Sequence, residues 1–136
     1  MNSYPQFTQT LERFVKDNIK LSHIRNLVSK GLRKVELVIT PSGLINFRFW
    51  GHHLSTANFD SKDSFLNESK SLASQEPLGY ALLNSCINAE ESSFKYGIPK
   101  AYTLVVEVIG DSSYRCTIKV PRTVGKGEIV RSLKHE

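Results

Sequence analysis

The stretch KVELVITPSGLINFRFW, residues 34–50, decides the fold of this chain. Apolar and polar side chains alternate on both sides of a central Pro-Ser-Gly, as expected of two β-strands that each bury one face. Proline suits the first central position of a type I turn, and Gly43 can take the positive φ angle that follows it in a three-residue loop. The sequence therefore predicts a β-hairpin whose loop is residues 41–43.

The length of this loop also predicts which residues of the two strands face each other. Paired residue numbers then sum to 84, so the large apolar side chains of both strands meet on one face. On the other face Glu36 is expected to pair with Arg48 as an ion pair, and Lys34 with Trp50 as a cation–π contact. The predicted apolar pairs are Val35–Phe49, Leu37–Phe47 and Ile39–Ile45.

The chain before the hairpin predicts helices. Ser3 and Gln6 have the spacing of a capping box, with Ser3 as the N-cap and Pro5 in the first turn, and apolar residues then recur at helical spacing. A second short helix, or a continuation of the first, is expected over residues 21–30. Gly31 is suited to close it in a left-handed conformation.

The second half of the chain predicts one strong helix and another hairpin. Pro77 opens the helix at the favoured first position, and the Gly and Pro of residues 97–99 should end it. Alternating apolar residues predict a hairpin over residues 102–120, followed by a last short strand at 128–133. Residues 51–76 are polar and rich in serine, and a short helix within them would shorten an otherwise long loop.

Together these segments predict one α+β domain over residues 1–136. We expect a mostly antiparallel sheet of four to five strands, built from two hairpins, with helices packed on one face. Single strands do not alternate with single helices, which argues against a doubly wound parallel sheet.

Composition narrows the class of protein. The 136 residues are 40% hydrophobic and 23% charged, which is ordinary for one folded domain, and no apolar run approaches a membrane span. No signal peptide is apparent, so we expect a cytoplasmic chain that is complete from Met1. Cys86 and Cys116 belong to no CxxC pair and are expected to be reduced thiols in the core. No metal-ligand spacing, phosphate loop or nucleophile elbow occurs, so neither a metal nor a cofactor is expected.

His52 and His53 follow the first hairpin and raise the question of catalysis. In a metal-independent ribonuclease they would act as general acid and base, with Lys34, Arg48 or Tyr114 holding a phosphate. Adjacent residues on extended backbone point to opposite faces, so at most one of the two histidines could serve such a site. The simpler interpretation is a strand end with two surface histidines, and no catalytic residue is assigned.

A basic surface is the stronger functional signal. The chain carries a net charge of +5, and its basic residues gather in residues 16–34 and 115–134. If both hairpins belong to one sheet, its outer face should be basic with an aromatic at the rim, suited to bind phosphates and stack one base. We therefore predict a non-enzymatic protein that contacts nucleic acid, RNA included, or a nucleoprotein assembly. The predicted contact residues are Lys34, Arg48, Trp50, Arg115, Lys119, Arg122 and Lys126.

A protein–protein interaction module is the alternative. The same face can meet an acidic protein partner, and Val38, Leu44 and Trp50 would leave apolar area on it. A partner chain, a second copy of the protein or a larger assembly would cover these side chains. An inhibitor or assembly subunit of the phage or mobile-element type would have these properties.

Overall fold

The computed structural model describes residues 4–51, 55–61, 76–110, 113–121 and 128–135. In these ranges two helices lead into three strands, and a further helix with a short 3-10 turn leads into three more. The elements are α1 (Pro5–Asn18), α2 (Leu21–Ser29), β1 (Leu32–Ile39), β2 (Ile45–Gly51), β3 (Ser55–Phe59), α4 (Pro77–Ser92), η1 (Phe94–Tyr96), β4 (Tyr102–Val108), β5 (Tyr114–Pro121) and β6 (Glu128–His135).

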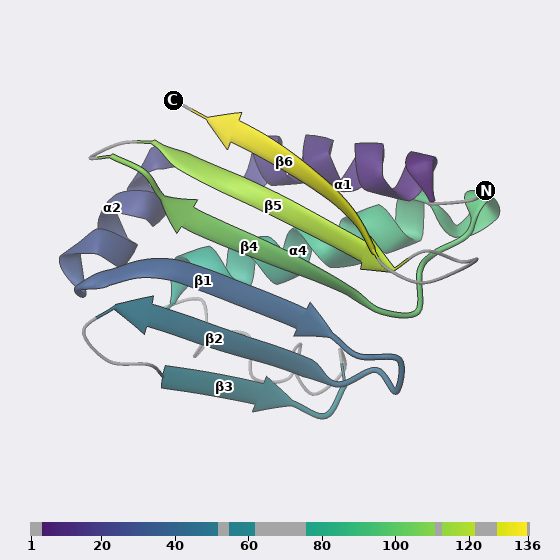
Figure 1. Ribbon diagram of the computed structural model, residues 1–136, viewed down its shortest axis with the longest axis horizontal. Helices are drawn as coiled ribbons and strands as arrows, with labels where there is room; N and C mark the ends of the chain where they lie inside the picture. Colours follow the sequence, from purple (N-terminus) through teal and green to yellow (C-terminus); the bar gives the residue numbers. More distant parts are fainter. Residues whose placement is uncertain (1–3, 52–54, 62–75, 111–112, 122–127, 136) are drawn as a thin grey trace.

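The strands form one antiparallel sheet in the order β3-β2-β1-β4-β5-β6. Its helices lie behind one face, and the other face is turned toward the viewer in Figure 1. The order of helix and three-stranded meander occurs twice, and the first strands of the two meanders, β1 and β4, pair at the centre. The predicted α+β class, with an antiparallel sheet and helices on one face, is confirmed.

The register predicted for the first hairpin is confirmed. Lys34 lies opposite Trp50 and Glu36 opposite Arg48, and every pair between these residues and the loop follows the same rule. Gly43 has a φ of 92°, and its N–H donates to the carbonyl oxygen of Thr40 over 2.9 Å, which closes the turn. The last predicted strand is also present, as β6, whereas β3 was not predicted.

The predicted N-cap of the first helix is wrong. The helix begins at Pro5, and its N-cap is Tyr4, in a left-handed conformation at φ 53° without a side-chain cap. With Ser3 as N-cap, Tyr4 would have been helical, and a residue before proline is disfavoured from the helical region. Ser3 itself lies outside the described residues, as does the short helix expected near residues 63–73.

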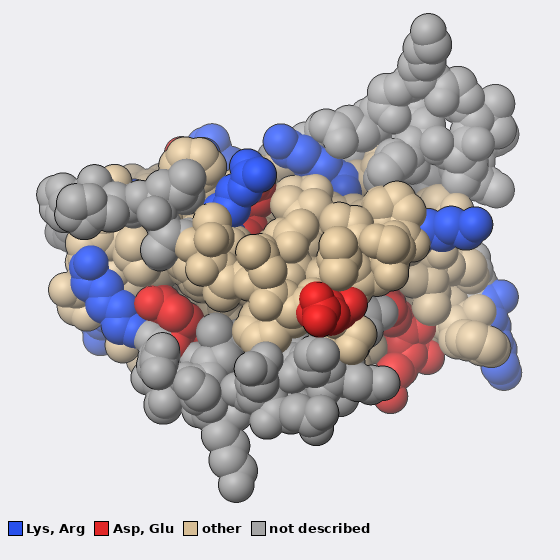
Figure 2. All heavy atoms as spheres, turned by 90° about the horizontal axis from the view of Figure 1, so that it is seen from below, with Lys and Arg blue, Asp and Glu red and all other residues tan. Residues whose placement is uncertain are grey.

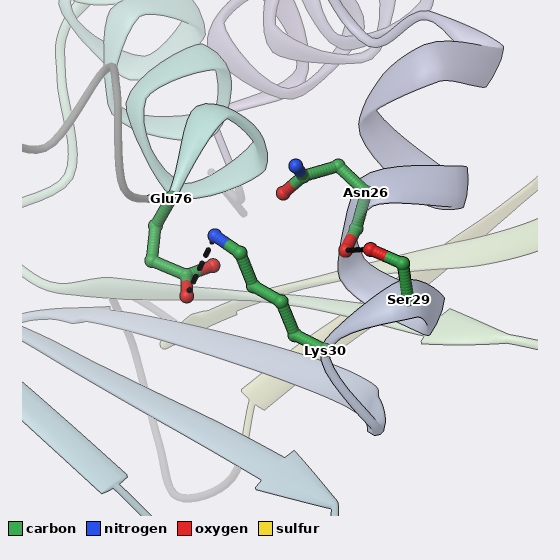
Figure 3. A network of polar contacts seen from close by, with 4 residues as sticks. All are labelled: Asn26, Ser29, Lys30 and Glu76. Carbon is green, nitrogen blue, oxygen red and sulfur yellow. Dashed lines mark hydrogen bonds and ion pairs between the residues drawn. The ribbon is translucent and has the colours of Figure 1, made fainter.

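A polar contact joins two of the helices at one end of the molecule. Lys30 at the C-terminal end of α2 places its Nζ 3.4 Å from Oε1 of Glu76, the residue that precedes α4 (Figure 3). The hydroxyl of Ser29 donates to the carbonyl oxygen of Asn26 over 2.7 Å in the same turn. Partly exposed ion pairs contribute little, about 0.2–1 kcal/mol, so this contact orients the helix ends more than it stabilises them.

The hydrophobic core fills the space between the helices and the sheet. Phe47 and Phe49 of β2 stack with ring centres 5.8 Å apart, and Phe7 of α1 meets Tyr102 of β4 edge to face at 4.9 Å. Both cysteines are buried and neither forms a disulfide, in agreement with the predicted reduced thiols. None of the helices in the described part of the chain has the length and apolarity that crossing a membrane requires.

Replacing Gly79 by alanine should stabilise the protein. Gly79 is buried in α4, and a Cβ there would lie 3.5 Å from ring atoms of Phe47 and Phe49, an ordinary contact distance. Alanine favours a helix over glycine by about 1 kcal/mol, so we expect the free energy of unfolding to rise by about 0.5–1 kcal/mol. Urea denaturation of Gly79→Ala tests this, and a lower midpoint would mean that the two rings cannot accept the methyl group.

Candidate functional site

The outer face of the sheet carries the predicted contact residues that the structure describes. Arg48 is exposed between buried Phe47 and Phe49, so its side chain points away from the helices. Lys34 and Trp50 lie on the same face of the hairpin. On β5, Arg115 and Lys119 alternate with buried residues and share this face. Arg122 and Lys126 lie outside the described residues.

Two of these residues are held by neighbours on the hairpin. Arg48 places its NH1 nitrogen 3.7 Å from Oε1 of Glu36, and Nζ of Lys34 lies 4.8 Å from the centre of the Trp50 ring. Both contacts were predicted from the register and are confirmed. They also mean that part of the positive charge on this face is already engaged within the protein.

A carboxylate that was not predicted as part of the site lies between two of its cations. The pairing of β1 with β4 and of β4 with β5 aligns Trp50, Lys34, Glu107 and Arg115 in one row across the sheet. In the next row Glu36 lies between Arg48 and Val105. The described outer face therefore carries the carboxylates of Glu36 and Glu107 among its cations, so its charge is of mixed sign although the cations are in excess. In Figure 2, which views the molecule from the side where β3 lies, acidic and basic side chains are likewise interspersed.

Trp50 is separated from Val38 and Leu44, the two other apolar residues expected to share its patch. The Glu36–Arg48 pair lies between Val38 and Trp50 along the hairpin, and Leu44, 40% exposed, sits at the hairpin end. Val38 instead has Val105 of β4 as its diagonal neighbour across the central pair of strands. The apolar part of the outer face is thus centred on β1 and β4.

A hollow of about 830 Å³ opens at one end of the sheet, where α2 leads into β1 and where β2 and β4 end. Gly31, Gly51 and Gly110 contribute to its wall. The other residues that line it are Val28, Arg33, Lys34, Trp50, Glu107, Val108 and Ile109. The hollow therefore joins the charged row of the outer face to a small apolar surface.

No family model, curated protein or solved structure matches the chain. The function is therefore inferred from the chain's own residues, namely those of the outer face and of the hollow.

The catalytic alternative gains no support from the described residues. Tyr114 is buried on the helix-covered side of the sheet, so it cannot hold a phosphate together with Lys34 and Arg48 on the other side. His52 and His53 lie outside the described residues. Within the described ranges no group of three or more His, Cys, Asp or Glu side chains could hold a metal ion.

His23 has a structural role at the start of α2. Its Nδ1 accepts the backbone N–H of Lys20 over 2.9 Å, which caps the helix. Burial, reinforced by the charge of Lys20, lowers the pKa of His23 below its ordinary value. The lowered pKa favours the neutral imidazole. His23 also lines a smaller hollow of about 330 Å³ with Tyr80 and Asn84 of α4.

Proposed function

We propose that this chain is a non-catalytic binding protein whose outer sheet face contacts a protein, alone or as part of a nucleoprotein assembly. The observation that carries the proposal is the six-stranded sheet with its described helices on one face only. Its other face combines partly exposed Val38 and Val105 with charges of both signs. Apolar area framed by charged groups is the usual composition of a protein interface.

The mixed charge favours a protein over a polyanion as partner. Nucleic-acid affinity depends on Lys and Arg that neutralise phosphates, and carboxylates among them oppose it. Glu36 and Glu107 lie directly beside cations of this face. A face with side chains of both charges instead suits a protein surface whose charges are placed oppositely, because such charge complementarity gives specificity.

Direct contact with nucleic acid is the second candidate, and two cations on β5 favour it. Arg115 and Lys119 point outward from one strand with Thr117 between them, and neither forms an ion pair with a described residue. The predicted contacts Arg122 and Lys126 follow along the chain. Trp50 would contribute by stacking, although Lys34 already covers part of its ring.

A variant at the centre of the face tests the protein-binding proposal. Val105→Glu places a charge at a partly exposed position, where we expect the fold to persist and capture of the partner to fall at least about tenfold, because the carboxylate is desolvated at the interface. Tagged protein is used to capture partners from lysate with and without nuclease. Gln9→Glu on the exposed side of α1 is the matched control. Equal capture by both variants would contradict the proposal.

The same capture decides the second candidate. If partners are lost on nuclease treatment, binding to RNA is measured against salt concentration for the unmodified chain and for the double variant Arg115→Ala, Lys119→Ala. Each lost phosphate contact lowers the slope of log affinity against log salt by about one, so the double variant should lose about two. An unchanged slope would remove both residues from the contact.

A further inference from the structure

The hollow at the end of the sheet is held open by backbone that only glycine allows. A Cβ on Gly51 would lie 2.1 Å from the carbonyl oxygen of Gly31, so the end of β2 passes directly against the start of β1. Gly31 itself has a φ of 78°. The wall at this point is bare backbone, and no side chain of these residues fills the space of about 830 Å³. Volumes of this size are typical of pockets that receive a ligand or a side chain.

A β-bulge brings two cations into the same hollow. The pairing of β1 with β2 shifts between Leu32 and Lys34, which leaves Arg33 unpaired in the ladder. Regular alternation would point Arg33 and Lys34 to opposite faces of the sheet, but both line the hollow. Bulges re-aim side chains in this way, often beside functional sites.

The two cations differ in the contacts that they already make within the protein. Nζ of Lys34 lies over the Trp50 ring, and Glu107 is its cross-strand neighbour. Arg33 is exposed and forms no ion pair with any described residue. A guanidinium offers five donors in a planar fork that matches a carboxylate. Arg33 is thus the group in the hollow that is ready to accept an anion.

The remaining wall is apolar. Val28 and Val108 are partly exposed, and Ile109 keeps 38% of its surface in solvent. Together with Trp50 they give the hollow that Arg33 also lines an apolar part. A nucleotide base fits this surface less well, because Lys34 already occupies one face of the indole on which the base would stack.

We propose that this hollow receives a segment of the protein partner in which an apolar side chain is followed by a carboxylate. The apolar side chain packs against Val28, Val108 and Ile109, and the carboxylate pairs with Arg33. This inference rests on the proposed function, since it assumes a protein partner, and it assigns to that partner one anchoring segment beside the contact with the outer face.

Trp50 provides a direct readout, because it is the single tryptophan of the chain and lines the hollow. The probe is the peptide acetyl-Ala-Leu-Asp-Ala-amide, titrated while the Trp50 emission is recorded. Two matched peptides replace the aspartate by asparagine or the leucine by alanine, and adenosine monophosphate is the nucleotide probe. We expect a saturable change with the first peptide and at least about tenfold weaker binding of the other two peptides.

Variants of the full-length chain assign the contact. Arg33→Ala should weaken binding of the Leu-Asp peptide about tenfold, and Arg33→Lys should recover part of it. Arg25→Ala, at another exposed arginine outside the lining residues, should leave binding unchanged. No saturable change with the Leu-Asp peptide, equal binding of the asparagine peptide, or tighter binding of adenosine monophosphate would each overturn the inference.

Failure of the anchoring segment and failure of the proposed function remain distinguishable. Val105 does not line the hollow, and the Val105→Glu capture experiment reports on the outer face alone. Loss of capture in Val105→Glu without any peptide binding would retain the protein-binding function and reject the anchoring segment. Peptide binding without an effect of Val105→Glu would reject the outer face as the contact surface.

Discussion

Replacing Gly51 by alanine is expected to lower the free energy of unfolding by about 3 kcal/mol, near the upper end for an overpacked site. The added methyl group would lie 2.1 Å from the carbonyl oxygen of Gly31 and 2.9 Å from Cα of Leu32. Both obstacles are backbone atoms, so a rotamer change cannot relieve the contact. The end of β2 must move away from the start of β1, which also disturbs the hollow between them. Urea denaturation measures the loss, and the Trp50 emission of the folded variant should change as well.

Gly43 provides the control for this substitution. Unlike Gly51 it has a positive φ, at 92°, and a Cβ there meets no atom within 4 Å. Gly43→Ala should therefore show only the conformational cost of a left-handed residue, about 1–2 kcal/mol. A loss at Gly51 no larger than the loss at Gly43 would show that the close approach to Gly31 costs less than the geometry indicates.

Alkaline pH is expected to destabilise the fold. Buried cysteine and tyrosine side chains stay protonated in the folded state at pH values where the unfolded chain has already lost these protons. Burial and the nearby Glu12 raise the pKa of Cys116 from 9.0 to about 12, and burial with Cys116 alongside raises the pKa of Tyr114 to about 12. Burial, followed by the proximity of Cys86 and Glu90, raises the pKa of Tyr102 well above 10. In each case the folded state keeps a proton that the unfolded chain releases earlier. The stability is therefore full below pH 9 and falls as pH rises toward 12.

The size of this loss follows from the pKa difference. A difference of about three between the folded and unfolded Cys116 corresponds to about 4 kcal/mol, in order of magnitude, once both states have titrated. The measurement is urea denaturation at several pH values above 8, with a reductant present to keep both thiols reduced. Cys116→Ala should flatten the decline by up to about 1.4 kcal/mol per pH unit in this range. A decline that is the same in the variant would show that the thiol does not contribute.

The local features of the fold could be predicted because each depends on residues that lie close together in the sequence. Three residues between two alternating runs are enough to pair Glu36 with Arg48 and to bring Lys34 over Trp50. Strand β3 was missed because it has five residues in a polar, serine-rich segment. The cap at Tyr4 could have been foreseen from the proline that follows it.

The candidate site was less predictable because it depends on pairings between distant segments. Glu107 was recognisable as an outward residue of an alternating strand, but its position between Lys34 and Arg115 requires the β1–β4 ladder. The shift in strand pairing at Arg33 could not be predicted from the neighbouring sequence, since neither Arg33 nor Lys34 is unusual in a strand. The hollow depends both on the position of Glu107 and on the shift in pairing at Arg33, so no pattern in the sequence predicted it.

The repeated order of helix and meander has a kinetic consequence. Strands within each meander are consecutive in the chain, whereas β1 and β4 join residues that are 63–73 positions apart. Contacts between distant residues must overcome a larger loss of chain entropy before they form, and folding rates fall as such contacts dominate. We therefore expect each half to organise on its own and the central ladder to close last. The alignment of Lys34, Glu107 and Arg115, and with it the wall of the hollow, would then be completed only in the final step of folding.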